Sequence, residues 1–150
     1  MKRIFIDADK CDGCKNCSVA CMDAHRKDGM SDIYTVNLGD PANETRNFIY
    51  ATKDGYRPIF CRHCDSPMCA ASCMSGALHK DEDTGLVLYD ESRCGSCFMC
   101  VMNCPFGVPK PDRLTRTKVI KCDFCSEKDC EPSCVKACPK KAIWVEEVRQ

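Results

Sequence analysis

The fold of this chain is decided by the stretch CGSCFMCVMNCP at residues 94–105. Its cysteines are separated by two, two and three residues, and a proline follows the last of them. The final spacing places two cysteines four residues apart, on one face of a single helical turn. The stretch therefore predicts a tight cysteine loop that leads into a short helix.

Three more groups of cysteines vary this spacing along the chain. The first group repeats it, the second has two extra residues before its third cysteine, and the fourth ends in the same C-x3-C-P. The groups are Cys11, Cys14, Cys17 and Cys21; Cys61, Cys64, Cys69 and Cys73; Cys94, Cys97, Cys100 and Cys104; and Cys122, Cys125, Cys134 and Cys138. Cys130 is the one cysteine of the seventeen that lies outside these groups. Pairing it with Cys134 would place Pro132 inside the helical turn, so we expect Cys130 not to be a ligand.

The composition indicates that sulfur chemistry replaces part of the apolar core. The apolar fraction of 44% falls to about 33% when the 17 cysteines of 150 residues are left out, which is low for a globular domain. Inorganic clusters bound by the cysteines would fill the remaining interior, and folding would then depend on their insertion. We therefore expect the apoprotein to be largely unfolded.

The spacing favours iron–sulfur clusters over two other uses of cysteine. Three close cysteines followed by C-x3-C-P match the run that holds three irons of one [4Fe–4S] cluster and passes its fourth cysteine to a neighbouring cluster. Structural zinc sites need two C-x2-C pairs about 12 to 20 residues apart, and disulfides need an export route that the N-terminal sequence lacks. Sixteen cysteines therefore predict four [4Fe–4S] clusters.

The lengths of the connections suggest which groups exchange cysteines. Residues 74–93 form a short link between groups two and three, which suits one two-cluster unit, and groups one and four then pair around it. The expected ligand sets are Cys11, Cys14, Cys17 and Cys138; Cys122, Cys125, Cys134 and Cys21; Cys61, Cys64, Cys69 and Cys104; and Cys94, Cys97, Cys100 and Cys73.

The expected fold class is α+β, with two nested bacterial-ferredoxin-like dicluster units of short strands and short helices around the cluster loops. Strand-like segments are predicted at residues 3–7, 47–52, 86–89, 118–120 and 143–145, and a turn at residues 81–85. We expect one unit over residues 1–150, with an outer half of about 1–55 plus 112–150 and an inner half of about 56–111.

Nearly the whole chain resembles the four-cluster ferredoxin-like electron-transfer subunits of dimethyl sulfoxide reductase, formate dehydrogenase, hydrogenase and CO dehydrogenase systems. The resemblance rests on residues 11–21, 61–64, 97–109, 121–125 and 134–139. Met74 departs from it, because proline is common after the last cysteine of the second group, and Cys130 is surplus. The resemblance implies the same nested ligation and a role as a non-catalytic subunit between a catalytic partner and a second redox partner.

The expected function is electron relay through four clusters in an oxidoreductase complex of anaerobic metabolism. The catalytic partner would be a molybdenum or tungsten enzyme, a CO dehydrogenase or a hydrogenase that acts on formate, aldehyde, CO or hydrogen, and the second partner an electron carrier or a flavin subunit. Two alternatives stay open: a free, diffusible polyferredoxin, and a zinc-binding or thiol-storage protein. The chain has no Gly-rich nucleotide loop, so no flavin or nicotinamide site and no catalytic residue is expected.

Charge and hydropathy argue against nucleic acid and membrane as partners and indicate a cytoplasmic location. The 22 basic and 22 acidic residues balance, which argues against nucleic-acid binding. Four clusters of about −2 each would make the loaded protein about −8, so the basic residues would compensate for it. No apolar run approaches the roughly 18 residues of a membrane span and no export signal precedes Cys11, so we expect a cytoplasmic protein without direct membrane insertion.

Other residues near the cysteines receive less specific predictions. We expect a surface or hydrogen-bonding role for His63, and solvated side chains for His25 and His79. Aromatic side chains are expected to pack around the clusters: Trp144, Phe98, Phe106 and Phe124. Six basic residues beside cysteines either offset cluster charge or are ordinary solvated side chains: Lys15, Arg62, Arg93, Lys121, Lys140 and Lys141.

Overall fold

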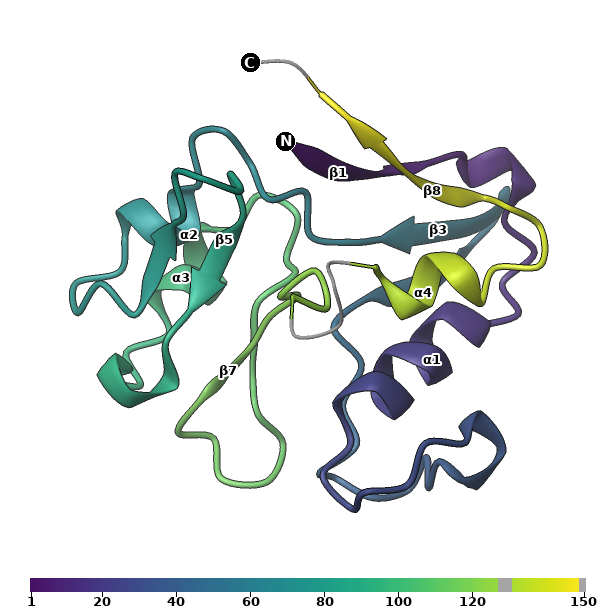
Figure 1. The fold of residues 1–150 in the computed structure, drawn as a ribbon, viewed down its shortest axis with the longest axis horizontal. Helices are drawn as coiled ribbons and strands as arrows, with labels where there is room; N and C mark the ends of the chain where they lie inside the picture. Colours follow the sequence, from purple (N-terminus) through teal and green to yellow (C-terminus); the bar gives the residue numbers. More distant parts are fainter. Residues whose placement is uncertain (127–130, 149–150) are drawn as a thin grey trace.

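The chain folds into short helices and two-stranded sheets that alternate with cysteine loops (Figure 1). The structure is a computed structural model and describes residues 1–126 and 131–148. Its helices are α1 (Asn16–His25), α2 (Met68–Ala71), α3 (Met99–Asn103) and α4 (Ser133–Lys136), with 3-10 turns η1 (Ala8–Lys10), η2 (Ile33–Thr35) and η3 (Glu91–Arg93). Its strands are β1 (Lys2–Ile6), β2 (Phe48–Thr52), β3 (Gly55–Ile59), β4 (Leu78–Lys80), β5 (Val87–Tyr89), β6 (Lys110–Pro111), β7 (Val119–Ile120) and β8 (Ile143–Glu147).

The strands pair antiparallel as β1–β8, β2–β3, β4–β5 and β6–β7. All five predicted strands are present, with ends shifted by one or two residues. The sequence did not predict β3, β4 or β6, and β3 contains Pro58. A proline is tolerated there because each two-stranded sheet has only edge strands, which leave one side of the backbone unpaired.

The two ends of the chain lie side by side. Ile4 of β1 faces Val145 of β8, and helices α1 and α4 pack against each other beside this sheet (Figure 1). Helices α2 and α3 pack together on the opposite side of the molecule, next to the β4–β5 hairpin. The middle of the chain therefore forms one side of the molecule, and the two terminal regions form the other.

A left-handed residue precedes the second cysteine of every group. These residues are Gly13, His63, Ser96 and Phe124, with φ of 74°, 43°, 55° and 62°. Such a conformation turns the backbone sharply, and it is costly for residues other than glycine. The same sharp turn therefore occurs in all four cysteine loops.

Cysteine sulfur is part of the packed interior. One buried cluster joins Cys17 and Cys134 to Ile4, Phe60 and Phe124, and a second joins Cys100 to Leu78, Val87 and Val119. Within residues 1–126 and 131–148, no helix combines the length and apolar character needed to cross a membrane. The small mixed helix-and-strand architecture confirms the predicted α+β class.

Candidate functional site: four cysteine foursomes

The C-x3-C turns send their two cysteines to different sites. Cys17 and Cys21 both lie on α1, four residues apart, yet their thiols line two separate hollows. The same separation occurs around α4, where Cys134 lines one of these hollows and Cys138 lines the other. Each short helix therefore acts as a spacer between neighbouring cysteine sites.

Three hollows are each lined by four cysteines from two groups. Pocket A is lined by Cys11, Cys14, Cys17 and Cys138. Pocket B is lined by Cys21, Cys122, Cys125 and Cys134. Pocket C is lined by Cys61, Cys64, Cys69 and Cys104. The structure thus brings together twelve of the predicted ligands in the predicted combinations.

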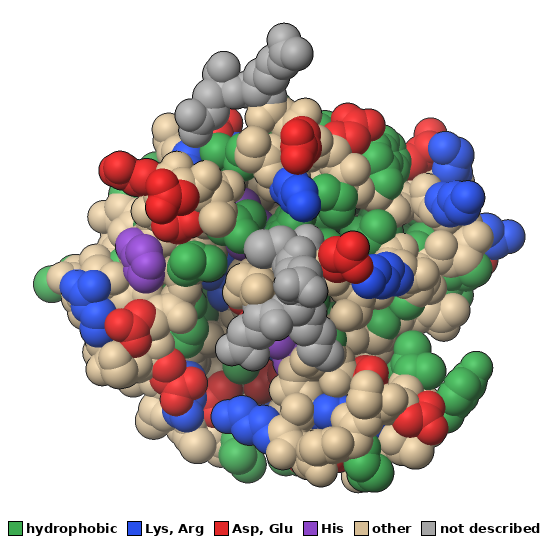
Figure 2. Space-filling view, viewed as in Figure 1, with side chains coloured by type: hydrophobic (Ala, Val, Ile, Leu, Met, Phe, Trp, Pro, Cys, Tyr) green, Lys and Arg blue, Asp and Glu red, His purple; other side chains and the backbone are tan. Residues whose placement is uncertain are grey.

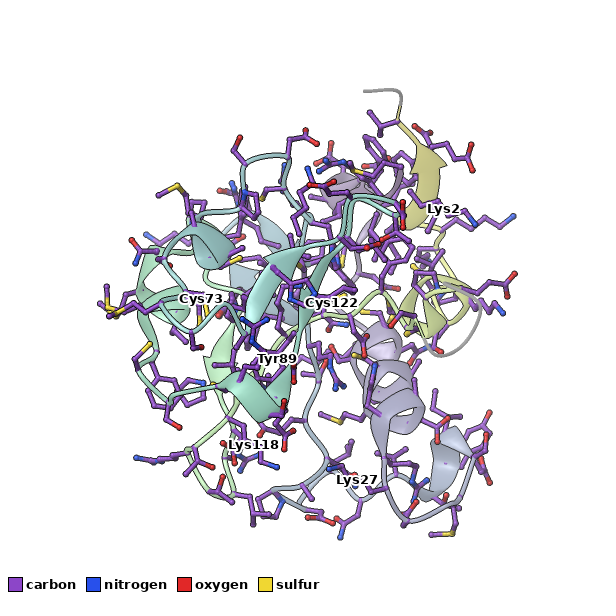
Figure 3. All side chains as sticks on the ribbon, turned by 60° about the vertical axis from the view of Figure 1, so that its left-hand side comes forward. Lys2, Lys27, Cys73, Tyr89, Lys118 and Cys122 are labelled. Carbon is purple, nitrogen blue, oxygen red and sulfur yellow. The ribbon has the colours of Figure 1, made fainter. Side chains whose placement is uncertain are left out.

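The remaining predicted ligands form foursome D: Cys73, Cys94, Cys97 and Cys100. Cys73 and Cys94 pack against the buried Cys100 beside the β4–β5 hairpin, whereas Cys97 is exposed. Figure 3 shows Cys73 toward one side of the molecule and Cys122 of pocket B near its middle. Cys130 lies outside the described residues, so the prediction that it is not a ligand stays a prediction.

Backbone amides donate to several of the cysteine sulfurs. The N–H of Leu78 lies 3.3 Å from Cys73 Sγ, that of Ala142 lies 3.3 Å from Cys138 Sγ, and that of Arg46 lies 3.3 Å from Cys21 Sγ. In the expected ligand sets, each of these three cysteines is combined with three cysteines of a different group. An amide donor stabilises negative charge on sulfur, so the folded backbone favours the thiolate form at these positions.

The buried thiols need a cation before they can ionise together. Burial raises the pKa of Cys17 and of Cys100 to about 11, and it raises the pKa of Cys122 and Cys134 well above the usual thiol value. Each of these buried thiols would stay protonated at neutral pH without a bound metal. Iron supplies the positive charge that lets all four bind as thiolates, so the donor set fits a [4Fe–4S] cluster.

The spacing of the sulfurs fits a cluster better than a single zinc ion. Tetrahedral zinc with bonds of about 2.3 Å to sulfur requires sulfur atoms about 3.8 Å apart. In the part of the chain that the structure describes, no three cysteine sulfurs lie within 4.8 Å of one another, and the set that meets this limit is His25, Asp123 and Cys125. Each hollow therefore spreads its sulfurs around a volume larger than one ion.

His25 lies partly buried beside pocket B, with 14% of its side chain exposed, so the prediction of a solvated side chain is wrong. Its Nδ1 donates to the carbonyl oxygen of Cys21 at 2.7 Å, and its Nε2 donates to the Asp123 carboxylate at 3.0 Å. Burial lowers its pKa, but the hydrogen bonds to Asp123 and Cys21 and the charge of Asp123 together outweigh this effect and raise the pKa to about 10. Asp123 is 98 residues away in sequence, so the only local signal was the i, i+4 spacing of Cys21 and His25 on α1.

His63 is buried and lines pocket C, which confirms hydrogen bonding and excludes a surface role. The N–H of Val87 donates to its Nδ1 at 3.0 Å, so the neutral ring carries its proton on Nε2. Burial lowers the pKa of His63 to about 3, which keeps it neutral. Its ring lies edge-on to Phe124 of pocket B, with centroids 5.6 Å apart. These two rings connect pockets B and C.

The aromatic and basic residues divide into distinct environments. Phe124 lines pocket B, Phe106 lines pocket C and Phe98 packs beside foursome D, whereas Trp144 stacks on Phe5 in the β1–β8 sheet. His79 is exposed, as predicted. Lys121 is buried, and five of the six basic residues are exposed: Lys15, Arg62, Arg93, Lys140 and Lys141. Figure 2 shows basic and acidic side chains intermixed across one face of the molecule.

Asp112 holds the loop that leads into the fourth cysteine group. Its carboxylate accepts the N–H groups of Thr115 at 2.6 Å and Lys118 at 2.8 Å, and the Thr115 hydroxyl at 2.8 Å. Burial raises the pKa of Asp112, but these donors outweigh it and hold the pKa well below its usual value. This stabilisation is present above the unfolded-state pKa of 3.8 and is lost as the pH falls below it.

Asp112→Asn should destabilise the β6–β7 loop by about 1–3 kcal/mol at neutral pH, because charge-assisted hydrogen bonds become neutral ones. The temperature at which the loaded protein loses its visible absorbance should fall at neutral pH, and the difference from wild type should shrink only as the pH falls below 3.8. Asp83→Asn, at an exposed position, should leave that temperature unchanged. Equal effects of the two substitutions would contradict the role of Asp112.

The comparisons with known proteins agree with this chemistry. A family described as "4Fe-4S dicluster domain" matches residues 52–148. The chain is 38% identical over 157 residues to YnfG, a probable anaerobic dimethyl sulfoxide reductase subunit of Escherichia coli K12, covering 97% of this chain and 75% of that one.

Two other relatives are similar to most of this chain. One polypeptide of the anaerobic dimethyl sulfoxide reductase of Escherichia coli K12 is 38% identical over 147 residues, covering 93% of this chain and 70% of that one. The beta subunit of NADH-dependent phenylglyoxylate dehydrogenase of Aromatoleum evansii is 35% identical over 140 residues, covering 93% of this chain and 29% of that one. The cysteine sites, the family match and these relatives together show that the chain belongs to the 4Fe–4S dicluster domain family of ferredoxin-like electron-transfer subunits.

Proposed function

We propose that this chain is a non-catalytic electron-transfer subunit that holds four [4Fe–4S] clusters on sixteen cysteines. The observation that carries the proposal is the sharing of cysteines between groups: pockets A, B and C each combine three cysteines of one group with one of another. This is the ligation expected of paired clusters, in which each loop gives one cysteine to its neighbour.

Each foursome would hold one cluster, and a bound cluster supplies reversible transfer of one electron. The loops bring the thiolates to one centre, the amides of Leu78, Ala142 and Arg46 stabilise charge on sulfur, and the apolar side chains limit access of water. Pocket B and pocket C are adjacent through His63 and Phe124. The protein matrix thus holds neighbouring redox sites close together without a substrate site of its own.

The proposed organisation is two nested halves in one domain. Pockets A and B form the outer half, at about residues 1–55 and 112–150, and pocket C and foursome D form the inner half, at about residues 56–111. The β1–β8 pairing and the contact of α1 with α4 support the first half, and the contact of α2 with α3 supports the second. The fourth cysteine group would belong to the outer half although it follows the inner half in sequence.

The partners follow from the names of the relatives. The relatives from dimethyl sulfoxide reductase and phenylglyoxylate dehydrogenase are parts of oxidoreductase complexes. This chain would pass electrons between a catalytic subunit of the molybdenum, tungsten, CO dehydrogenase or hydrogenase type and a second electron carrier or flavin subunit. A cytoplasmic location is part of the same proposal.

Anaerobic purification from native extract tests the number of clusters and the subunit role together. The expected result is about sixteen irons and about sixteen sulfides per chain, with co-elution of a large catalytic polypeptide. A lone species near the chain mass of 16.8 kDa with the same iron content would favour a free polyferredoxin instead. A colourless protein, or one that contains zinc in place of iron and sulfide, would contradict the proposal.

A further inference from the structure

Lys121 differs from the other basic residues beside the cysteines because it is buried. Only 4% of its surface is exposed, although it directly precedes Cys122 in the loop after β7. A buried ammonium group is costly unless hydrogen bonds and an opposite charge compensate for the loss of water. Its surroundings should therefore contain its counter-charge.

The hydrogen bonds of Lys121 are made to neutral acceptors. Its Nζ donates to the carbonyl oxygen of Val87 at 2.6 Å and to that of Cys122 at 2.7 Å. Among residues 1–126 and 131–148, no carboxylate lies within 4.0 Å of this nitrogen, whereas Lys110 and Lys118 both pair with glutamates. The two carbonyls fix the position of the ammonium group but do not neutralise its charge.

The thiol-lined hollows lie on both sides of this charge. Lys121 lines pocket C together with Cys69, and the next residue, Cys122, lines pocket B. Burial raises the pKa of Cys69 and of Cys122, and the charge of Lys121 opposes that rise at both sulfurs. Arg46 Nε donates to the carbonyl oxygen of Lys121 at 2.9 Å and so holds its backbone in place. One cation therefore lines pocket C and donates a hydrogen bond to Cys122, the neighbouring residue that lines pocket B.

We infer that Lys121 is the shared counter-charge of the clusters held in pockets B and C, and that it raises the reduction potential of both. The inference rests on the proposed function. A cluster gains one negative charge when it accepts an electron, and a fixed cation in a low-dielectric interior favours that more negative form. Lys121 lies where the outer and inner halves meet, so it favours the arrival of electrons at the junction between them.

The test is an anaerobic redox titration of the loaded protein, followed by electron paramagnetic resonance, for wild type and Lys121→Met. Methionine keeps the length and the apolar stem of the side chain and removes the charge. We expect two of the four reduction potentials to fall, each by at least tenfold in the equilibrium constant for reduction, or about 59 mV for one electron. The other two reduction potentials should change by less than half of this shift in potential.

Two further variants separate charge from packing. Lys121→Arg keeps the charge and should leave all four potentials closer to wild type than Lys121→Met does. Lys53→Met removes an exposed charge that lies outside the linings of pockets A, B and C, where solvent screens it, and should not lower any potential tenfold.

Every outcome decides the inference. If Lys121→Met does not retain its clusters but Lys121→Arg does, the positive charge is needed to hold the two anionic clusters. That result supports the inference. Unchanged potentials in a fully loaded Lys121→Met, a shift in one cluster alone, or failure of both variants to load would overturn it. Absence of four clusters from the wild-type protein would contradict the proposed function itself, so the two failures are distinguishable.

Discussion

Alanine at Cys21 will abolish the same iron–sulfur signal as alanine at Cys125, and alanine at Cys17 will abolish a different one. Cys17 and Cys21 lie four residues apart on α1, but they line pocket A and pocket B, respectively. A ligand set built only from neighbours in sequence would assign both cysteines to one cluster. The nested arrangement assigns them to two.

The measurement is electron paramagnetic resonance of the reduced protein, together with iron analysis, for each single variant. We expect each variant to lose one cluster completely, or to lose one iron from it, and so to retain between about twelve and fifteen of about sixteen irons. Cys17→Ala should match Cys138→Ala, because both line pocket A although they are 121 positions apart. Matching spectra for Cys17→Ala and Cys21→Ala would refute the nested ligation.

A second pair of variants applies the same test to the inner half. Both Cys69 and Cys73 pack against the buried cluster that contains Cys100, but only Cys69 also lines pocket C, and the nested arrangement assigns Cys73 to foursome D. Cys73→Ala and Cys100→Ala should therefore lose the same signal, and Cys69→Ala should lose another. In both comparisons, the two substituted cysteines lie four residues apart in the sequence. If their variants lose different signals, differences in burial or in local helix stability do not explain that result.

Removal of iron should unfold the chain. The helices are at most ten residues long and the sheets have two strands each, and neither element is stable alone in water. The accessible surface of 9149 Å² exceeds the roughly 7,600 Å² expected for a folded monomer of this mass, so the polypeptide alone buries less surface than a typical domain of this size. Because Cys17, Cys100 and Cys134 belong to the buried clusters of side chains, loss of the metal also leaves the interior unfilled.

Anaerobic chelation followed by small-angle scattering and far-ultraviolet circular dichroism measures this effect. The radius of gyration should rise from roughly 15 Å toward roughly 40 Å, and the helical signal should disappear. Iron and sulfide added back under anaerobic conditions should restore both, whereas Zn²⁺ alone should not. An apoprotein that keeps the smaller radius would show that hydrophobic packing is sufficient for the fold.

Local signals in the sequence were enough to predict the elements that surround the cysteines. A C-x3-C spacing requires one helical turn, and residues 81–85 carry the turn residues that close the β4–β5 hairpin, where Gly85 has a φ of 69°. The strands β1 and β8 were also recognisable as apolar runs. The lengths of the connections predicted the cysteine combinations that line pockets A, B and C, and their ligation of iron stays a prediction.

Burial of polar groups was not predictable in the same way. His25 was expected to be solvated, yet it lies between Cys21 and Asp123, and its partner comes from the other end of the chain. The hydropathy of a residue describes only its own side chain. It does not show which other residues will cover that side chain in the folded protein. A charged residue beside a cysteine therefore has the same sequence signature whether solvent or a second loop surrounds it.

The sequence by itself determined the chemistry of this protein, because the number, type and spacing of cysteines restrict which metal centres the chain can bind. Only the tertiary structure decided which charges act on those centres. Lys121 is buried because Val87, 34 residues earlier in the chain, supplies a carbonyl oxygen to its ammonium group. Electrostatic effects depend on distance in space and on exclusion of water, and neither quantity exists until the loops have packed together.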